Sequence, residues 1–278
     1  MIDEVILQRH GRTAFNLARR LQGQIDVPLD IVGQWQADHA AYELADRLYW
    51  AKISHIARNP TLLAQPGEGA ARRSDIEEYE LAPAARRTLL VTSSPLFRAR
   101  QTAHATADIL GLPVATDAGL LERAFGQWEG LTREEIAERW PGAYDSWTAH
   151  RGGELAYGVE SRHDVGERGA KALIRIVREH ADDPTPTTLL AVSHGSWIVA
   201  TVSTLLDMDV DDLNALGGMR NAFWTTMRVS RGADGLRWEL EEFNEGPSLA
   251  AHVDWDNGPE ALRHPGMPLW KPVRSGRA

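Results

Sequence analysis

Val5-Ile6-Leu7-Gln8-Arg9-His10-Gly11 is the first indication of the fold of this chain. Three apolar residues run directly into polar residues and a glycine, as a short buried strand does where its carboxyl end enters a turn. Two later stretches repeat the pattern. Residues 88–92 lead into Ser93-Ser94-Pro95, and residues 187–192 lead into Ser193-His194-Gly195-Ser196. We therefore expect three strands of one sheet, each ending in a polar turn.

Apolar residues at helical spacing predict three helices around these strands. The predicted helices cover residues 33–49, 97–110 and 162–179. Asp30 is the expected N-cap of the first, and Ser161 resembles the start of a capping box for the third. Gly111 is the expected stop of the second helix.

Strands that alternate with helices predict an α/β fold with a mostly parallel central sheet flanked by helices. Residues 222–229 and 237–243 are expected to be two more strands joined by a tight turn. In such sheets the ligand binds beyond the carboxyl ends of the strands. His10 and His194 each follow a predicted strand, so the sequence places the site between them.

We predict a single domain over residues 1–246. Three segments fit the sheet poorly: a surface insertion at about 50–87, a cap over the site at about 128–157, and a C-terminal arm at 247–278. The arm is expected to be irregular and packed through Trp255 and Trp270, or to be a partly disordered tail.

Composition excludes several classes of protein. The 278 residues contain no cysteine, which rules out disulfides, thiolate zinc sites, iron–sulfur clusters and a cysteine nucleophile. The net charge of −9 disfavours nucleic acid and anionic membranes as partners. No apolar run approaches the ~20 residues that span a bilayer. We expect a cytoplasmic protein, and its ten tryptophans leave room for the interface of a homo-oligomer.

The chemistry of the strand-end residues points to a phosphoryl group. A neutral histidine such as His10 can attack phosphorus, and Arg9 offers a planar fork to phosphate oxygens. Asn16 adds an uncharged donor. An isolated Arg-His-Gly would more often be a strand-end histidine beside a surface charge, so these residues need support from the other segments.

Three further segments of the sequence supply that support. Arg98, in the first turn of a predicted helix, can clamp further phosphate oxygens, and His194, if cationic, would stabilise charge on the transferring group. A leaving alkoxide needs a proton donor, for which both Glu122 and Glu129 are available. In the absence of a phosphoryl site, Arg98 and the two glutamates would be solvated charges, and His194 would be a core histidine.

A metal site must also be weighed. Two histidines with carboxylates could bind zinc or iron, but no His-x-x-x-His or comparable spacing of ligands is present. We therefore predict neither a metal nor another cofactor. The remaining eight histidines, His163 among them, are expected to be structural or solvated.

Together these segments resemble the histidine phosphatase superfamily, also called the phosphoglycerate mutase-like family. The matching residues, in the family's order, are Arg9-His10-Gly11 with Thr13 and Asn16, Leu21-Gln22-Gly23, Ser93-Ser94-Pro95-Leu96 with Arg98, Glu122 with Phe125-Gly126 and Trp128-Glu129-Gly130, and Ser193-His194-Gly195. Each piece is weak alone, but five in order are specific. The resemblance covers residues 3–244 except for the insertion.

The resemblance implies a role for each matching residue. His10 would become a phosphohistidine, and Glu122 matches the family's proton donor, so it is preferred to Glu129. The residues implied to hold the phosphoryl group or line the substrate are Arg9, Thr13, Asn16, Gln22, Gly23, Arg98, His194 and Gly195. The partner would be a small phosphorylated metabolite, and the chemistry needs no metal.

Departures from the family pattern bear on the activity. Arg12 stands where the family often has Glu or Gln, and is expected to add positive charge near the mouth of the site. Mutases of the family usually carry an Arg-Arg pair in the cap and a Tyr three residues after the acid. Here that residue is Phe125, and residues 130–157 contain no Arg-Arg. We favour a phosphatase; the alternatives are a phosphoglycerate mutase-type transfer and a non-catalytic protein that binds phosphate esters.

Overall fold

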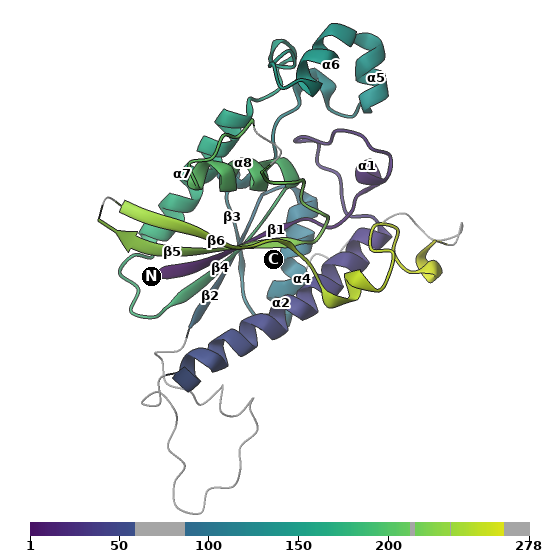
Figure 1. Ribbon diagram of the computed structural model, residues 1–278. Helices are drawn as coiled ribbons and strands as arrows, with labels where there is room; N and C mark the ends of the chain where they lie inside the picture. The colour runs from purple at the N-terminus through teal and green to yellow at the C-terminus, as the bar shows by residue number, and fades with distance from the viewer. Residues whose placement is uncertain (59–86, 212–214, 234, 264–278) are drawn as a thin grey trace, which may run out of the picture.

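A computed structural model describes residues 1–58, 87–211, 215–233 and 235–263. Its strands are β1 (Ile2–Arg9), β2 (Thr88–Ser93), β3 (Val114–Thr116), β4 (Thr187–Ser193), β5 (Trp224–Gly232) and β6 (Gly235–Glu245). They form one sheet in the order β3-β2-β4-β1-β5-β6 (Figure 1). The first four run parallel, and β5 and β6 are added antiparallel beyond β1. The predicted α/β fold is confirmed. The sheet is mixed because β5 runs antiparallel to both of its neighbours, β1 and β6.

The two central strands carry the two histidines to one edge. β1 and β4 are parallel neighbours, with Arg9 opposite Ser193 in the register. Every residue of β4 is buried, as are Val5, Ile6 and Leu7 of β1. A strand covered by helices on both faces needs such a continuous apolar run. Because the register is parallel, the residues that follow both strands emerge side by side.

In the part of the chain that the structure describes, four helices cover the sheet, namely α2 (Ile31–Arg58), α4 (Phe97–Leu110), α7 (Arg162–Glu179) and α8 (Gly195–Leu205). α2 packs with α4 on one face and α7 with α8 on the other (Figure 1). Their predicted ends are largely confirmed. Asp30 accepts a hydrogen bond from the Gly33 amide (2.7 Å), Ser161 accepts one from the Asp164 amide (3.0 Å), and Gly111 ends α4 with a left-handed φ of +65°.

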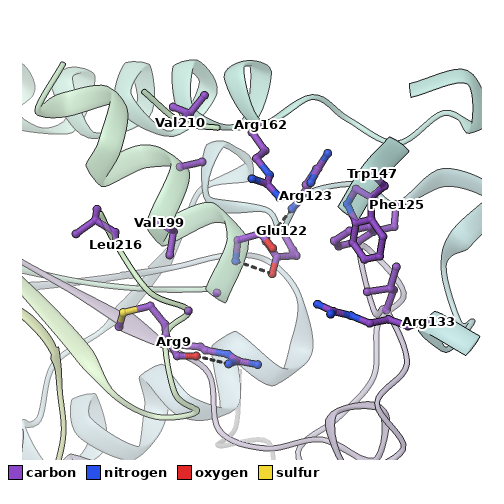
Figure 2. Close-up of a pocket in the computed structure, with 16 residues that line it drawn as sticks. Arg9, Glu122, Arg123, Phe125, Arg133, Trp147, Arg162, Val199, Val210 and Leu216 are labelled. Carbon is purple, nitrogen blue, oxygen red and sulfur yellow. Dashed lines mark hydrogen bonds between the residues drawn. The ribbon is translucent and has the colours of Figure 1, made fainter. Parts of the chain in front are cut away.

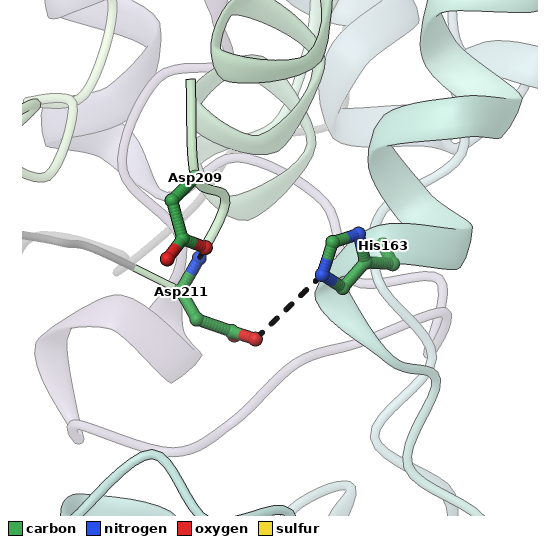
Figure 3. A group of neighbouring side chains, drawn as sticks. All are labelled: His163, Asp209 and Asp211. Atoms are coloured by element: carbon green, nitrogen blue, oxygen red, sulfur yellow. Dashed lines mark hydrogen bonds and ion pairs between the residues drawn. The ribbon is translucent and has the colours of Figure 1, made fainter. Parts of the chain in front are cut away.

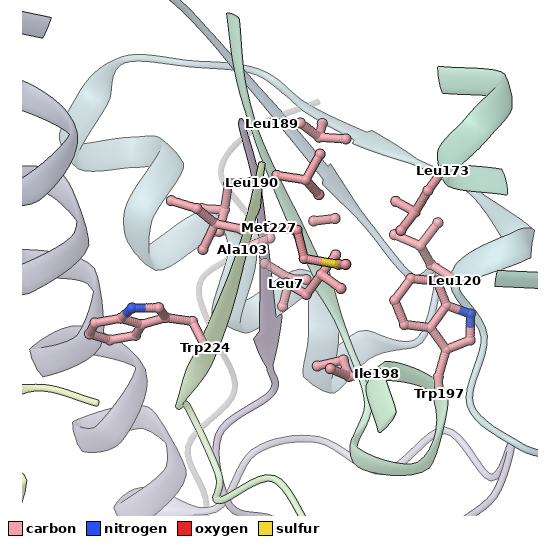
Figure 4. Close-up of a cluster of buried hydrophobic side chains, with 14 of the residues drawn as sticks. Leu7, Ala103, Leu120, Leu173, Leu189, Leu190, Trp197, Ile198, Trp224 and Met227 are labelled. Atoms are coloured by element: carbon pink, nitrogen blue, oxygen red, sulfur yellow. The ribbon is translucent and has the colours of Figure 1, made fainter. Parts of the chain in front are cut away.

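The hydrophobic core fills both sides of the sheet (Figure 4). Leu7, Leu190 and Met227 come from neighbouring strands, while Trp197 of α8 and Leu173 of α7 cover one face. Each is at most 1% exposed. Burial of one such side chain contributes roughly 1.5–3 kcal/mol, so the strand ends that carry the site rest on a rigid base.

The predicted cap forms a small unit of its own at one end of the molecule, where α5 (Arg133–Arg139) and α6 (Pro141–Thr148) lie together (Figure 1). A second apolar cluster holds it, with Phe125, Trp128 and Trp147 among its buried members. Short 3-10 turns, Gly126–Trp128 and Leu155–Tyr157, connect it to the rest of the chain.

The structure corrects two local expectations. The insertion was expected from residue 50, but α2 continues to Arg58, because the prolines and glycines that break a helix begin only at Pro60. Residues 59–86, most of the expected insertion, lie outside the described residues. β3 was not predicted, since a three-residue edge strand carries too little periodicity.

The described part of the C-terminal arm contains two 3-10 turns, Ser248–Ala251 and Glu260–Leu262. Trp255 lies between them, 1% exposed, with its ring 5.0 Å from that of Trp35 and 6.0 Å from that of Phe223. Its predicted packing is confirmed, whereas Trp270 lies outside the described residues. Among the helices that the structure describes, none is both long and apolar enough to cross a membrane.

Candidate active site

His10 and His194 meet beyond the ends of β1 and β4. Their ring centroids are 5.1 Å apart, and both side chains are at most 2% exposed. His10 Nδ1 lies 2.7 Å from the carbonyl oxygen of Gly11. A carbonyl oxygen can only accept a hydrogen bond, so Nδ1 carries the proton. This leaves the lone pair on Nε2, the nitrogen suited to attack.

Both histidines are neutral near pH 7. Burial lowers the pKa of His10 well below 6.5, and the charges of Arg98 and Arg9 lower it further. Burial likewise lowers the pKa of His194, with Arg98 the next cause. His194 Nε2 is 2.8 Å from Ser94 Oγ, which connects the ends of β4 and β2. A neutral imidazole at position 10 is the nucleophilic form.

Arg98 and Arg9 bring two cations to these rings. Arg98 is fully buried in the first turn of α4, and its two terminal nitrogens donate to the carbonyls of Gly23 (2.7 Å) and Ile25 (2.8 Å). Burial lowers its pKa to about 10, so it remains charged at neutral pH. Arg9 donates from Nη1 to the carbonyl of Met219.

Three buried polar nitrogens here have no hydrogen-bond partner in the described part of the chain: Arg9 Nε, Arg98 Nε and His194 Nδ1. Buried donors are nearly always paired in folded proteins. Two of these nitrogens belong to cationic side chains, and all three lie near His10. They therefore form a binding site for an anion that accepts several hydrogen bonds, as a phosphoryl group does.

Four of the other predicted binding residues lie in the segment that follows β1, and the fifth, Gly195, begins α8. Thr13 caps the short helix α1 (Ala14–Leu17) in a reciprocal capping box with Asn16. Thr13 Oγ1 also donates to Gln22 Oε1 (2.8 Å). Gly23 has a φ of +50°, and a Cβ there would lie 2.0 Å from a Glu129 oxygen. Gly195 packs against Arg9, whose Nε would be 3.4 Å from an added Cβ.

Glu122 and Glu129 differ in their partners. Glu122 Oε1 accepts from the amides of Arg123 (2.9 Å) and Trp197 (3.0 Å), whereas Oε2 has one long contact of 3.4 Å to the Ser196 amide. Glu129 Oε1 accepts from the amides of Gln24 (2.9 Å) and Phe125 (3.1 Å), which ties two loops together. Of the two, Glu122 faces the pocket described next.

A pocket of about 360 Å³ opens from Arg9 and Glu122 toward the cap (Figure 2). Arg123, Arg133 and Arg162 also line it, and they come from three separate segments. Arg123 was not predicted as a site residue, although its position directly after Glu122 could have indicated it. Arg162 begins α7, and nothing in its sequence context signalled that it would reach this pocket.

Two residues near the site behave in ways that the sequence did not indicate. Arg12, expected to add charge at the mouth, is 8% exposed and pairs with buried Asp30 at 2.8 Å, so its charge is neutralised inside the protein. It also donates to the carbonyl of Asp256 (2.9 Å). Asn221 donates from Nδ2 to the carbonyl of His10 (3.0 Å), a contact that joins residues 211 positions apart.

His163, Asp209 and Asp211 are the group of metal-type ligands found in the described residues (Figure 3). Their ligand atoms lie within 4.8 Å of one another, but all three residues are exposed. His163 Nε2 is 3.9 Å from Asp211 Oδ2, which fits a surface ion pair. Exposed acidic groups are common without a bound ion, so this cluster supports no metal assignment.

Comparisons with known proteins identify the family of this chain. The model of the histidine phosphatase superfamily (branch 1) matches residues 5–57 and 79–245. The chain is 31% identical to the glucosyl-3-phosphoglycerate phosphatase of Mycolicibacterium vanbaalenii over 91% of this chain and 99% of that protein. It is also 31% identical to the protein of that name from Mycobacterium tuberculosis, over 90% and 97% of the two chains. A solved structure of a mycobacterial glucosyl-3-phosphoglycerate phosphatase with VO3 is similar, with a TM-score of 0.62, 30% identity, and coverage of 88% of this chain and 100% of that one.

Proposed function

Because the chain belongs to the histidine phosphatase superfamily (branch 1), we propose that it hydrolyses a small phosphorylated metabolite through a phosphohistidine at His10. The observation that carries this proposal is the set of three unpaired buried nitrogens, on Arg9, Arg98 and His194, around a neutral histidine. The two mycobacterial relatives described above are named phosphatases and are covered over nearly their full length, and this chain is a phosphatase of the same family.

In the first step, His10 Nε2 attacks phosphorus in line with the leaving oxygen. The phosphorus–nitrogen bond forms and the phosphorus–oxygen bond breaks, while Glu122 transfers its proton to the leaving alcohol from Oε2, the oxygen with fewer backbone donors. Arg9, Arg98 and His194 donate to the phosphoryl oxygens as charge moves onto them.

In the second step, Glu122, now a carboxylate, removes a proton from water, and the water oxygen attacks the phosphohistidine. The phosphorus–nitrogen bond breaks, inorganic phosphate leaves, and Glu122 and His10 return to their starting states. Thr13, Asn16, Gln22, Gly23 and Gly195 shape the loop and helix start that enclose the phosphoryl group. The route as written uses no metal ion or cofactor.

Glucosyl-3-phosphoglycerate, named in the mycobacterial relatives, is the substrate we propose to test first. The complete set of Arg9, His10, Arg98, Glu122 and His194 argues against a protein that only binds phosphate esters. A cytoplasmic location and a homo-oligomeric state stay predictions, which fractionation of cells and light scattering would test.

The primary test is hydrolysis of p-nitrophenyl phosphate in excess chelator by the wild type, His10→Ala and the control His252→Ala, whose side chain is exposed. We expect wild type and control to be active and His10→Ala to be inactive, because the covalent route is gone. Most activity remaining in His10→Ala would refute the mechanism. Loss of activity to the chelator would restore the metal alternative. An inactive wild type would favour a mutase, a narrow phosphatase or a binding protein.

A further inference from the structure

The segment that carries Glu122 has no regular secondary structure of its own. Residues 121–125 lie between two 3-10 turns and belong to neither a helix nor a strand. The hydrogen bonds to the Glu122 carboxylate in the described chain come from backbone amides, those of Arg123, Ser196 and Trp197. The position of this carboxylate therefore depends on how the backbone of its segment is held against the start of α8.

Arg168 of α7 holds that backbone. Its Nη1 donates to the carbonyls of Gly119 (3.0 Å) and Leu121 (2.9 Å), and its Nη2 lies 3.4 Å from the carbonyl oxygen of Glu122 itself. A guanidinium presents its donors in one rigid plane, so one side chain can bind three carbonyls only when the backbone follows a particular path. Arg168 thus fixes the chain up to and including Glu122.

Glu160 extends this contact to the far side of Glu122. Its Oε1 accepts from Arg168 Nε (3.1 Å) and its Oε2 from Arg168 Nη2 (3.1 Å), so the ion pair is bidentate. Oε2 also accepts from the amide of Ala124 (3.1 Å), and the Glu160 amide donates to the Ala124 carbonyl (2.9 Å). With the three carbonyls, the pair uses all five N–H donors of Arg168, which leaves this guanidinium little freedom to move.

The same contacts connect Glu122 to the helices beside the phosphoryl site. α7 packs along α8, which begins directly after His194 (Figure 1). Trp197 of α8 donates from its indole to the Gly119 carbonyl (2.7 Å) and from its amide to Glu122 Oε1 (3.0 Å). Because a displacement of about 1 Å can slow a reaction roughly 100-fold, the placement of Glu122 relative to α8 bears directly on proton transfer.

Arg175 shows how an ordinary ion pair on this helix differs. It lies two turns further along α7, is half-exposed, and pairs with the carboxylates of Asp117 and Glu179. Its hydrogen bonds in the described chain go to these two side chains, not to the backbone of residues 119–122. Arg175 is therefore a matched control for the loss of a cation from α7.

We propose that Arg168, paired with Glu160, is a positioning residue for the proton donor Glu122. It holds Glu122 at the leaving oxygen and does not itself line the substrate pocket. This inference rests on the proposed phosphatase activity, and it predicts an effect that depends on the leaving group. A p-nitrophenolate leaves without a proton, whereas an alkoxide must be protonated as it leaves. Loss of Arg168 should slow the cleavage of alkyl esters and spare that of the nitrophenyl ester.

The test measures kcat/KM, which reports the steps up to release of the alcohol, for p-nitrophenyl phosphate and for the alkyl esters benzyl phosphate and glucosyl-3-phosphoglycerate. We expect Arg168→Gln to lower kcat/KM about 10–100-fold for the alkyl esters and less than about threefold for p-nitrophenyl phosphate. Arg175→Gln should change each value less than about twofold. Arg168→Lys keeps the charge but not the planar fork, so it should show the same selective loss at a smaller size, and it replaces Arg168→Gln if that variant does not fold.

Hydrogen exchange followed by NMR gives a second readout that needs no turnover. The Trp197 amide donates to Glu122 Oε1, whereas the amide of the next residue, Ile198, donates to the His194 carbonyl (2.9 Å). In Arg168→Gln the Trp197 amide should exchange about threefold faster or more, relative to Ile198, because its acceptor is displaced. A variant that merely loosened the whole fold would accelerate both amides alike.

Equal losses on the nitrophenyl and alkyl esters in Arg168→Gln, or no loss on the alkyl esters, would overturn the positioning role and leave the phosphatase activity standing. An unchanged ratio of the two exchange rates would also overturn it, whichever esters the wild type cleaves. A wild type inactive on every ester would instead refute the proposed function.

Discussion

Glu122 and Glu129 lie seven positions apart, and their hydrogen bonds to the backbone indicate different roles, one catalytic and one structural. Glu129 uses one oxygen to join the Gln24 and Phe125 loops, whereas Glu122 faces the pocket beside Arg9. Glutamine at 129 keeps a carbonyl oxygen that can accept both hydrogen bonds. Glutamine at 122 cannot supply a proton to a leaving alkoxide.

We therefore expect Glu122→Gln to lower kcat for an alkyl phosphate by roughly 10²–10⁴-fold, and Glu129→Gln by less than about tenfold. Steady-state kinetics on 3-phosphoglycerate or the natural ester would measure both, with the unfolding midpoints of the two variants as a control for folding. The opposite order would assign the proton donor to Glu129.

A second prediction concerns the charge and tautomer of the two buried histidines. Because burial and two arginines lower the pKa of both rings, His10 and His194 should be neutral at pH 6.5, and His10 should carry its proton on Nδ1. NMR of protein labelled with ¹⁵N in the histidine rings reports the charge and tautomer of each. A protonated His10 at that pH, or a proton on Nε2, would contradict the mechanism, since the nucleophilic lone pair would be absent.

At the scale of elements, the arm after β6 holds the loop that carries His10. Trp255 Nε1 donates to the carbonyl of Asn221 (2.9 Å), and its own carbonyl accepts from Gln36 Nε2 (2.7 Å). Asn221 in turn donates to the carbonyl of His10. The arm thus connects α2, the segment before β5 and the catalytic loop, although it lies beyond the residues that match the family model.

Trp255→Ala should lower the free energy of unfolding by about 3–5 kcal/mol, the usual cost of emptying a buried tryptophan site. Urea denaturation followed by circular dichroism would measure it, with Tyr42→Ala, which removes a side chain 66% exposed, as the control. A change below about 1 kcal/mol in Trp255→Ala would mean that the arm does not pack as described.

At the scale of the whole molecule, two neutral histidines buried between the strand ends tie stability to pH. Their folded pKa values lie below 6.5, so as pH falls through 6.5 the unfolded chain takes up protons that the native protein does not. Stability is then lost toward acid pH, by up to about 1.4 kcal/mol per pH unit for each histidine. This loss of stability occurs over the pH range from 6.5 down to the lowered pKa values of the two histidines in the folded protein.

Denaturation curves between pH 5.5 and 7.5 should therefore show the free energy of unfolding rising with pH. The double variant His10→Gln, His194→Gln should show a shallower slope, because both linked groups are gone. An unchanged slope in that variant would place the pH dependence elsewhere in the protein.

Much of the fold followed from local patterns. The predicted strands and helices recur at nearly the same residues because apolar periodicity and end signals, such as Asp30 and Gly111, act within a few residues of the chain. The meeting of His10 and His194 followed as well, since parallel neighbouring strands end at one edge. The short strand β3 and the extension of α2 to Arg58 were not predicted.

The architecture and the residue types at the strand ends can be read from the amino-acid sequence, because both depend on neighbours a few positions apart. Which side chains lack partners becomes apparent only in the folded chain. Arg12 is neutralised by Asp30 and Arg123 by Glu154, while Arg162 stays unpaired in the pocket. Whether a charge is paired depends on residues tens to hundreds of positions away that packing brings together, and no local pattern in the chain records those distances.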